Sequence, residues 1–168
     1  YDDRRSLVID PTLVWSTYLG GNGVDIMYGE ASGREYAFEA ADGSVILGSY
    51  QCIDIDTAGN LVVTGYTSSS NFPTTQGSVQ PSNDGGASCF FAAKFTSNGE
   101  QIWATYYSGG NYLHIGGICF DRAGNVLMGG MTASATFPVT AGAYQTSRMG
   151  DYDGVIIKLD SGGIRLWA

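Results

Sequence analysis

A ten-residue segment occurs twice in this chain, and no other feature limits the fold as strongly. Residues 56–65 (DTAGNLVVTG) return as residues 121–130 (DRAGNVLMGG), at an offset of 65 positions. The match continues beyond both segments and, after the loss of one residue, carries Trp103 to Trp167 at an offset of 64. A repeat of this kind indicates a supersecondary unit that buries its apolar face only by stacking on a neighbouring unit.

The second copy reads as four short strands. Residues 117–121 lead through a Gly-Asn turn into residues 126–132, and the two strands form a predicted hairpin. A long loop at 134–153 is followed by two further predicted strands, at 154–160 and 164–167. Four antiparallel strands per unit are typical of a β-propeller blade. We therefore expect an all-β fold, an incomplete β-propeller of four-stranded antiparallel blades, with about two full blades plus a partial one.

The two copies differ in the connection that precedes the repeated segment. Trp15 lies 41 positions before Asp56, whereas Trp103 lies only 18 positions before Asp121. The difference places an insertion at about residues 30–52, where an Asp-Gly pair between two apolar runs predicts an extra hairpin. A degenerate first half-blade is the alternative interpretation of the same residues.

The chain as a whole divides near residue 14. Residues 1–13 are interpreted as a lead-in strand or linker from a preceding region, and residues 14–168 as the repeat array. Two blades and a fraction do not close a ring, because propellers need about four to eight blades. We therefore expect the remaining blades to come from the same longer chain or from other chains.

Composition favours a β-rich domain and disfavours two classes of partner. The 168 residues are 43% hydrophobic and 14% charged and include 25 glycines, a profile typical of short strands joined by glycine turns. The net charge of −8 disfavours nucleic acid, whose binding proteins need a basic surface, and also anionic membranes. No apolar run approaches the roughly 20 residues of a membrane-spanning helix.

The cysteines indicate neither a metal site nor a redox motif. Cys52, Cys89 and Cys119 have no zinc-type spacing, and their odd number leaves at least one outside any disulfide. We interpret them as small buried hydrophobic residues. A disulfide between Cys52 and Cys119 is the alternative.

The repeated Asp-x-x-Gly-Asn motif predicts a hairpin turn. Glycine supplies a positive φ angle, and the side chains of aspartate and asparagine bond to nearby backbone groups. A calcium site is the alternative, but one carboxylate per loop is few for this ion, and we predict no cofactor. The predicted turn residues are Asp56, Gly59, Asn60, Asp121, Gly124 and Asn125.

Three tryptophans recur at the last strand of successive units. Trp15, Trp103 and Trp167 occupy equivalent positions in the partial, first and second copies. A repeated aromatic side chain usually fills the space between sheets, so we predict that all three are core residues. A platform for stacking sugars at the blade rim is the alternative.

The order of these motifs resembles the SBBP repeat, a bacterial β-propeller family. The resemblance rests on residues 15–21 (WSTYLGG), residues 56–67, residues 72–77 (FPTTQG) and the strand around Lys94, and it covers most of the repeat array. It implies a secreted or cell-surface bacterial protein, often multidomain, and it carries over no catalytic residues. The chain departs from the family in the insertion and at residues 112–114, where the family has a Gly-x-Asp stretch.

These features predict a non-catalytic function. We expect a secreted or cell-surface β-propeller scaffold or interaction module, part of a larger protein or assembly, that binds protein or glycan through its inter-blade loops. The sequence has no recognisable catalytic constellation, and no nucleophile motif accompanies its single histidine, His114. The alternatives are a lectin with one weak glycan site per blade and a carbohydrate-active enzyme that uses Glu30, Glu35 and Glu39.

Candidate partner contacts lie in the insertion and in the loops between blades. The insertion is the one element that the repeat does not require, and tyrosine and asparagine are adaptable contact residues in recognition loops. The candidates are Tyr28, Glu35, Tyr36, Glu39, Asn111, Tyr112 and His114.

Overall fold

The all-β prediction is confirmed by the computed structural model. The structure describes residues 13–27, 36–39, 45–48, 52–84, 89–110 and 113–168. Every regular element in these ranges is a β-strand. In the same ranges, no helix is long and apolar enough to cross a membrane.

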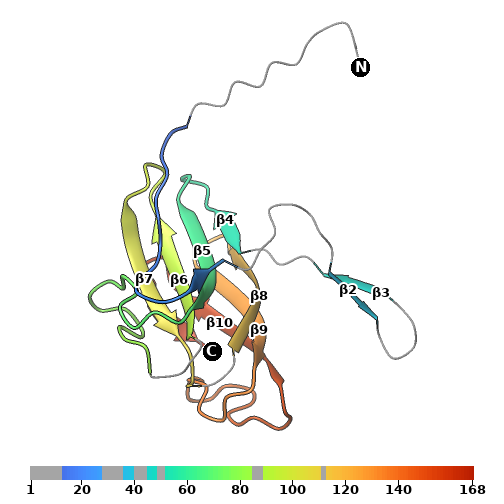
Figure 1. Ribbon diagram of the computed structural model, residues 1–168. Helices are drawn as coiled ribbons and strands as arrows, with labels where there is room; N and C mark the ends of the chain where they lie inside the picture. Colours follow the sequence, from blue (N-terminus) through green and yellow to red (C-terminus); the bar gives the residue numbers. More distant parts are fainter. Residues whose placement is uncertain (1–12, 28–35, 40–44, 49–51, 85–88, 111–112) are drawn as a thin grey trace, which may run out of the picture.

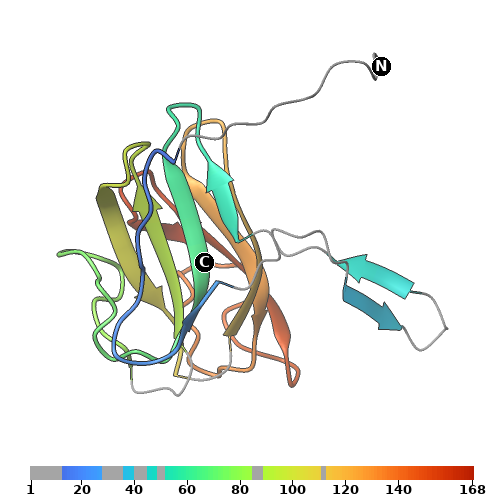
Figure 2. The same cartoon turned by 45° about the horizontal axis from the view of Figure 1, so that its top comes forward.

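The strands form two larger antiparallel sheets and one separate hairpin. The first sheet contains β1 (Asp25–Ile26), β4 (Ile53–Ile55), β5 (Leu61–Thr67), β6 (Cys89–Phe95) and β7 (Gln101–Tyr107). The second sheet contains β8 (Leu113–Phe120), β9 (Val126–Thr132), β10 (Asp153–Leu159) and β11 (Arg165–Trp167), in the order β11-β10-β9-β8. The hairpin pairs β2 (Tyr36–Glu39) with β3 (Val45–Gly48) and lies apart from both sheets in Figures 1 and 2.

The two sheets share the same strand register at the positions that the sequence aligns. In the first sheet β5 pairs with β6 from Leu61 opposite Phe95 to Thr67 opposite Cys89. In the second sheet β9 pairs with β10 from Val126 opposite Leu159 to Thr132 opposite Asp153. The offsets of 65 and 64 in the sequence therefore correspond to equivalent pairing positions in the two sheets.

The insertion interrupts the edge strand of the first sheet. In the second sheet β8 pairs with β9 from Leu113 to Phe120 as a single strand, and the register shifts once, between Ile115 and Gly117. In the first sheet the same edge is shared by two short strands, since β1 pairs with the end of β5 and β4 pairs with its beginning. The chain leaves this edge after Ile26 and returns at Ile53, and the β2–β3 hairpin lies in between. The Asp-Gly pair that predicted this hairpin falls at 40–44, outside the described residues.

The main core lies between the two sheets, which pack face to face in both views (Figures 1 and 2). Alternate residues of each strand point into this layer because side chains alternate across a sheet. The first sheet contributes Val62, Phe90, Ala92, Trp103 and Tyr107, and the second contributes Ile115, Ile118, Val126, Met128, Ile157 and Leu159.

A second core covers the other face of the first sheet. It contains Phe91 and Tyr106, and it is closed by Phe72 from the loop after β5 and by Leu19 from the N-terminal segment. That segment, residues 13–24, is not a β-strand in the structure, although the alignment of Trp15 with Trp103 predicted one there. Because both of its faces are covered, β6 is buried along its whole length, whereas in β10 more exposed and less exposed residues alternate.

Candidate functional site

The first Asp-x-x-Gly-Asn segment forms a tight turn between β4 and β5. Asp56 Oδ1 accepts the backbone N–H groups of Ala58 and Asn60, at 3.0 and 2.8 Å. Its Oδ2 accepts the Asn60 side-chain amide at 2.9 Å and lies 3.2 Å from Lys94 Nζ. Gly59 has a φ of 80°, the left-handed conformation that closes the turn.

The second segment repeats this geometry between β8 and β9. Asp121 Oδ1 accepts the N–H groups of Ala123 and Asn125, at 2.8 and 2.9 Å. Its Oδ2 accepts the Asn125 side-chain amide at 2.8 Å and lies 2.7 Å from Lys158 Nζ. Gly124 has a φ of 79°.

These contacts explain the charge state of both turns. Burial alone would raise the pKa of Asp56, but hydrogen bonds from Asn60 and Lys94 outweigh it and hold that pKa below its usual value. Lys158 is the main cause of a lowered pKa at Asp121. A calcium ion would have to displace an ammonium group from each carboxylate, so the donor sets present do not fit this ion. Within the described ranges no cluster of three or more His, Cys, Asp or Glu residues could hold a metal.

The three tryptophans predicted as core residues differ in burial. Trp103 is 4% exposed, and its Nε1–H donates to the Ser161 carbonyl at 3.0 Å. Trp15 is partly buried and makes the equivalent bond to the Ser97 carbonyl at 2.9 Å. Trp167 is 41% exposed and is therefore not a core residue in the described structure, because no sheet packs on the face that carries it.

The cysteines also differ from one another. No disulfide joins them. Cys52 and Cys89 are buried, as expected of small apolar residues, but Cys119 is exposed. Burial raises the pKa of the Cys89 thiol, which lies 2.9 Å from Asn83 Oδ1.

The predicted partner contacts are not gathered into one site by the described structure. Tyr28, Glu35, Asn111 and Tyr112 lie outside the described residues. Tyr36 and Glu39 are the first and last residues of β2, and His114, near the start of β8, pairs with Met131 near the end of β9. Of the acidic residues considered for glycoside chemistry, Glu30 and Glu35 also fall outside the described ranges.

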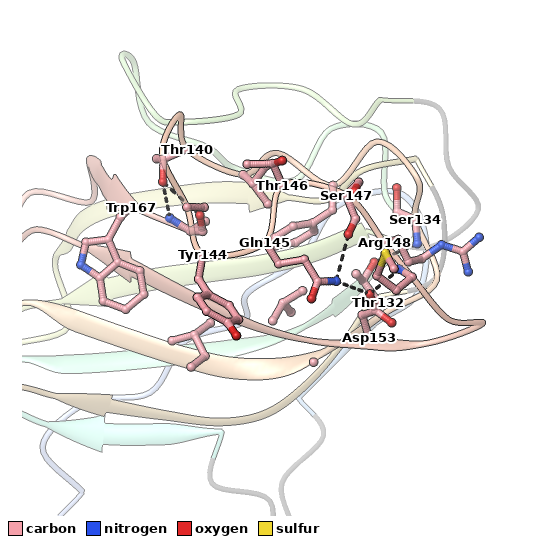
Figure 3. A pocket seen from close by; sticks show the side chains of 18 of the residues that line it. Thr132, Ser134, Thr140, Tyr144, Gln145, Thr146, Ser147, Arg148, Asp153 and Trp167 are labelled. Carbon is pink, nitrogen blue, oxygen red and sulfur yellow. Dashed lines mark hydrogen bonds between the residues drawn. The ribbon is translucent and has the colours of Figure 1, made fainter.

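A surface pocket of about 910 Å³ lies where the loop at 134–153 meets the second sheet. Its aromatic end holds Tyr144 and Trp167, and its polar end holds Gln145, Arg148 and Asp153 (Figure 3). Ile156 of β10 contributes an apolar side chain that is 58% exposed.

The polar end of this pocket is occupied by bonds that fix the loop itself. Asp153 accepts the backbone N–H groups of Met149 and Gly150, at 2.8 and 3.0 Å, and the Gln145 side-chain amide at 2.8 Å. The bond from Met149 is the main cause of a lowered pKa at Asp153. Arg148 donates to the carbonyl groups of residues 150 and 151. Arg148 and Asp153 thus line the pocket and also make hydrogen bonds within the loop.

One face of the second sheet, beside this pocket, is exposed although its counterpart on the first sheet is buried. We define the outer face of the second sheet as the face that carries Leu127, Ile156, Lys158 and Trp167. Lys158 is paired with both Leu127 and Trp167 on neighbouring strands, and Ile156 lies two residues away along β10, so all four side chains lie on the same face. The corresponding residues of the first sheet are Val62, Ala92, Lys94 and Trp103, which are 0%, 0%, 4% and 4% exposed. They are covered by the second sheet, which contributes the opposite side of the shared core.

A scan against protein-family models finds no match for this chain, and a search of curated proteins also finds none. The resemblance to the SBBP repeat therefore stays a prediction.

Sequence reasoning did not single out Tyr144 and Ile156, which line the pocket. They stand where the first copy has Val79 and Ala92, so a larger apolar side chain replaces a smaller one at both positions. This difference in side-chain size was the signal in the sequence that could have drawn attention to the two positions. It could not show that Tyr144 and Ile156 are exposed, because their burial depends on what packs against the sheet.

Proposed function

We propose that this chain is a non-catalytic interaction module of the β-propeller type, in which each larger sheet is one blade. The module belongs to a secreted or cell-surface bacterial protein or assembly, and it contacts a protein partner through the outer face of the second sheet and the loop at 134–153. Ring closure needs about four to eight blades, so further blades complete the assembly.

One observation carries this proposal. Ile156 and Trp167 are 58% and 41% exposed on a face whose counterpart in the first sheet is buried. Exposed apolar side chains gathered beside a pocket are typical of protein contact surfaces. Tyr144, which is fully exposed at the same place, adds an aromatic side chain of the kind that carries binding energy in such contacts.

Glycan binding is the second candidate, and the exposed rings of Tyr144 and Trp167 favour it. A lectin with one site per blade would place an open aromatic platform on each sheet. The equivalent position on the first sheet holds Trp103, which is buried against the second sheet. The outer face is therefore a better match for a protein surface than for a repeated sugar site.

Site-specific cross-linking tests the proposal. A photoreactive amino acid at Ile156, in cells that naturally produce the protein, should form a cross-link to a defined protein segment that peptide mapping identifies. The matched control is Tyr18, fully exposed on the N-terminal segment, which should give no discrete product. Equal cross-linking from both positions, or products that contain only glycan, would contradict a protein-binding role for the outer face.

A further inference from the structure

Each bound indole ring rests on a glycine of the turn that accepts its N–H group. A Cβ atom at Gly163 would lie 2.6 Å from Cδ2 of Trp103, and one at Gly99 would lie 2.7 Å from Cδ2 of Trp15. Both glycines have positive φ angles, 84° and 86°. The turn thus supplies a carbonyl acceptor and, two residues later, a bare backbone surface that only glycine provides. We call this arrangement a tryptophan seat.

The two seats join successive units in the same direction. Trp103 at β7 of the first sheet binds the turn between β10 and β11 of the second sheet. Trp15 of the N-terminal segment binds the turn between β6 and β7 of the first sheet. Each tryptophan therefore reaches forward to the unit that follows it in the sequence.

Trp167 corresponds to Trp103, yet the described residues provide no seat for it. The residues around Trp167 correspond to residues of the first sheet that are buried against the second sheet. Ile156, for example, occupies the position of Ala92 on the same face. Lys158 likewise corresponds to Lys94 of the first sheet. Lys94 Nζ lies 5.0 Å from the centre of the Phe120 ring, which belongs to the second sheet.

We propose that the outer face docks a third β-sheet unit of the same repeat, and that Trp167 occupies the tryptophan seat of that unit. This inference rests on the proposed function and names the partner that the outer face binds. The third unit would recognise Trp167 through a turn. The first residue of that turn accepts the indole N–H with its backbone carbonyl, and the third residue is a glycine with positive φ. An apolar sheet face beside that turn covers Ile156.

The described part of a second copy of this chain does not supply that partner. The two seats found there, at Ser97–Gly99 and Ser161–Gly163, are already occupied by its own Trp15 and Trp103. The second core on the far face of its first sheet is likewise closed by its own Phe72 and Leu19. A third unit with an empty seat fits the outer face without displacing any of these contacts.

The test extends the full chain by one unit. Ala168 and Ala104 are equivalent, so a copy of residues 105–168 can follow Ala168 in register and present its seat to Trp167 at high local concentration. With nitrogen-15-labelled tryptophan, the indole N–H groups of Trp15 and Trp103 should exchange slowly with solvent in the 168-residue chain, and that of Trp167 fast. In the extended chain the Trp167 signal, assigned with W167F, should exchange at least about tenfold more slowly.

Two variants of the added unit form a matched pair. Alanine at the added copy of Gly163 should restore fast exchange at Trp167, because a Cβ atom there enters the space of the ring. Alanine at the added copy of Gly124 introduces the same kind of backbone strain, but no atom lies within 4 Å of its Cβ position. Exchange at Trp167 should stay slow in this second variant.

Three results would overturn the inference. In the first, the added unit folds but the Trp167 indole N–H still exchanges fast. In the second, amide exchange shows that the added unit stays unfolded, although docking on a neighbour should stabilise it. In the third, the 168-residue chain dimerises and the dimer alone slows exchange at Trp167. If any of these occurs while cross-linking from Ile156 still identifies a protein segment, the proposed function stands with a different partner. If cross-linking also fails, the proposed function fails too.

Discussion

Two glycines with the same backbone conformation have different surroundings. Gly124 and Gly163 have φ angles of 79° and 84°, but only a Cβ atom at Gly163 would collide with a ring, that of Trp103. We expect G124A to cost about 1–2 kcal/mol from the strained φ angle alone. G163A should cost about 1–3 kcal/mol more, because Trp103 must shift out of a packed core. Urea unfolding measures both variants, and equal losses would contradict the role assigned to Gly163.

The ion pair between Lys158 and Asp121 should make stability depend on pH. Lys158 and Asn125 lower the folded-state pKa of Asp121, so the pair stabilises the fold above the unfolded-state pKa of about 3.9. That contribution is lost as the pH falls through the folded-state pKa. We expect K158M, which keeps most of the aliphatic stem, to be less stable than wild type at neutral pH.

The difference between wild type and K158M should shrink as the pH drops below about 3.9. Urea midpoints measured from neutral to acid pH check this expectation. A difference that stays constant across the whole range would mean that Lys158 acts through packing and not through its charge.

At the scale of single elements, one hydroxyl group holds the loop that follows β5. Tyr106 Oη donates to the Ser69 carbonyl at 2.9 Å and accepts the buried Phe72 N–H at 2.7 Å. Y106F should cost about 1–3 kcal/mol, because the Phe72 N–H loses its acceptor. Amide exchange at Phe72 should also become faster. The control is Y144F, whose fully exposed hydroxyl should contribute nothing to stability.

Strands β7 and β11 carry equivalent tryptophans with different neighbours. W103A removes a ring that is 4% exposed between two sheets and should cost about 3–5 kcal/mol. W167A removes a ring that is 41% exposed and should cost much less in this chain, on the order of 1 kcal/mol or below. Chemical denaturation of the two variants provides the comparison. Similar losses would mean that Trp167 packs as tightly as Trp103 and has no need of a further unit.

The elements that local patterns encode were predictable from sequence. The Asp-x-x-Gly-Asn turns and the strands on either side of them follow from glycine conformation and side-chain bonding within a few residues. Strand β1, Asp25–Ile26, was missed because two residues have no periodicity and pair with β5 across a long insertion. Strand β8 begins at Leu113, earlier than the predicted residue 117, because two glycines hide the alternation there.

The candidate site was less predictable than the strands, for a physical reason. The position of a tryptophan in the repeat determines which face of the sheet it occupies, and this holds for Trp103 and Trp167 alike. Whether that face is buried depends on a neighbouring sheet, which no local pattern specifies. The prediction of a core role was therefore right for Trp103 and wrong for Trp167 in the described structure.

At the scale of the whole molecule, the two larger sheets depend on one another. Their shared core draws on residues of both, whereas the second core of the first sheet is closed by a loop and the N-terminal segment. A direct bond also crosses the interface, from the Phe120 N–H to Asp54 Oδ2 at 2.9 Å. Neither sheet buries its side of the shared core without the other, so the pair should unfold as one unit.

A substitution in one sheet should therefore destabilise the other. Met128 is 1% exposed in the shared core, and M128A should cost about 2–5 kcal/mol. Because the sheets unfold together, the slowest amides of β5 and β6 should lose as much protection as those of β9 and β10, as measured by native-state hydrogen exchange. The control is M149A, since Met149 is 82% exposed on the loop beside the pocket and its loss should leave both sheets unchanged. Loss of protection confined to β8 through β11 would show that the sheets fold independently, and the outer face would then need no neighbour to stabilise it.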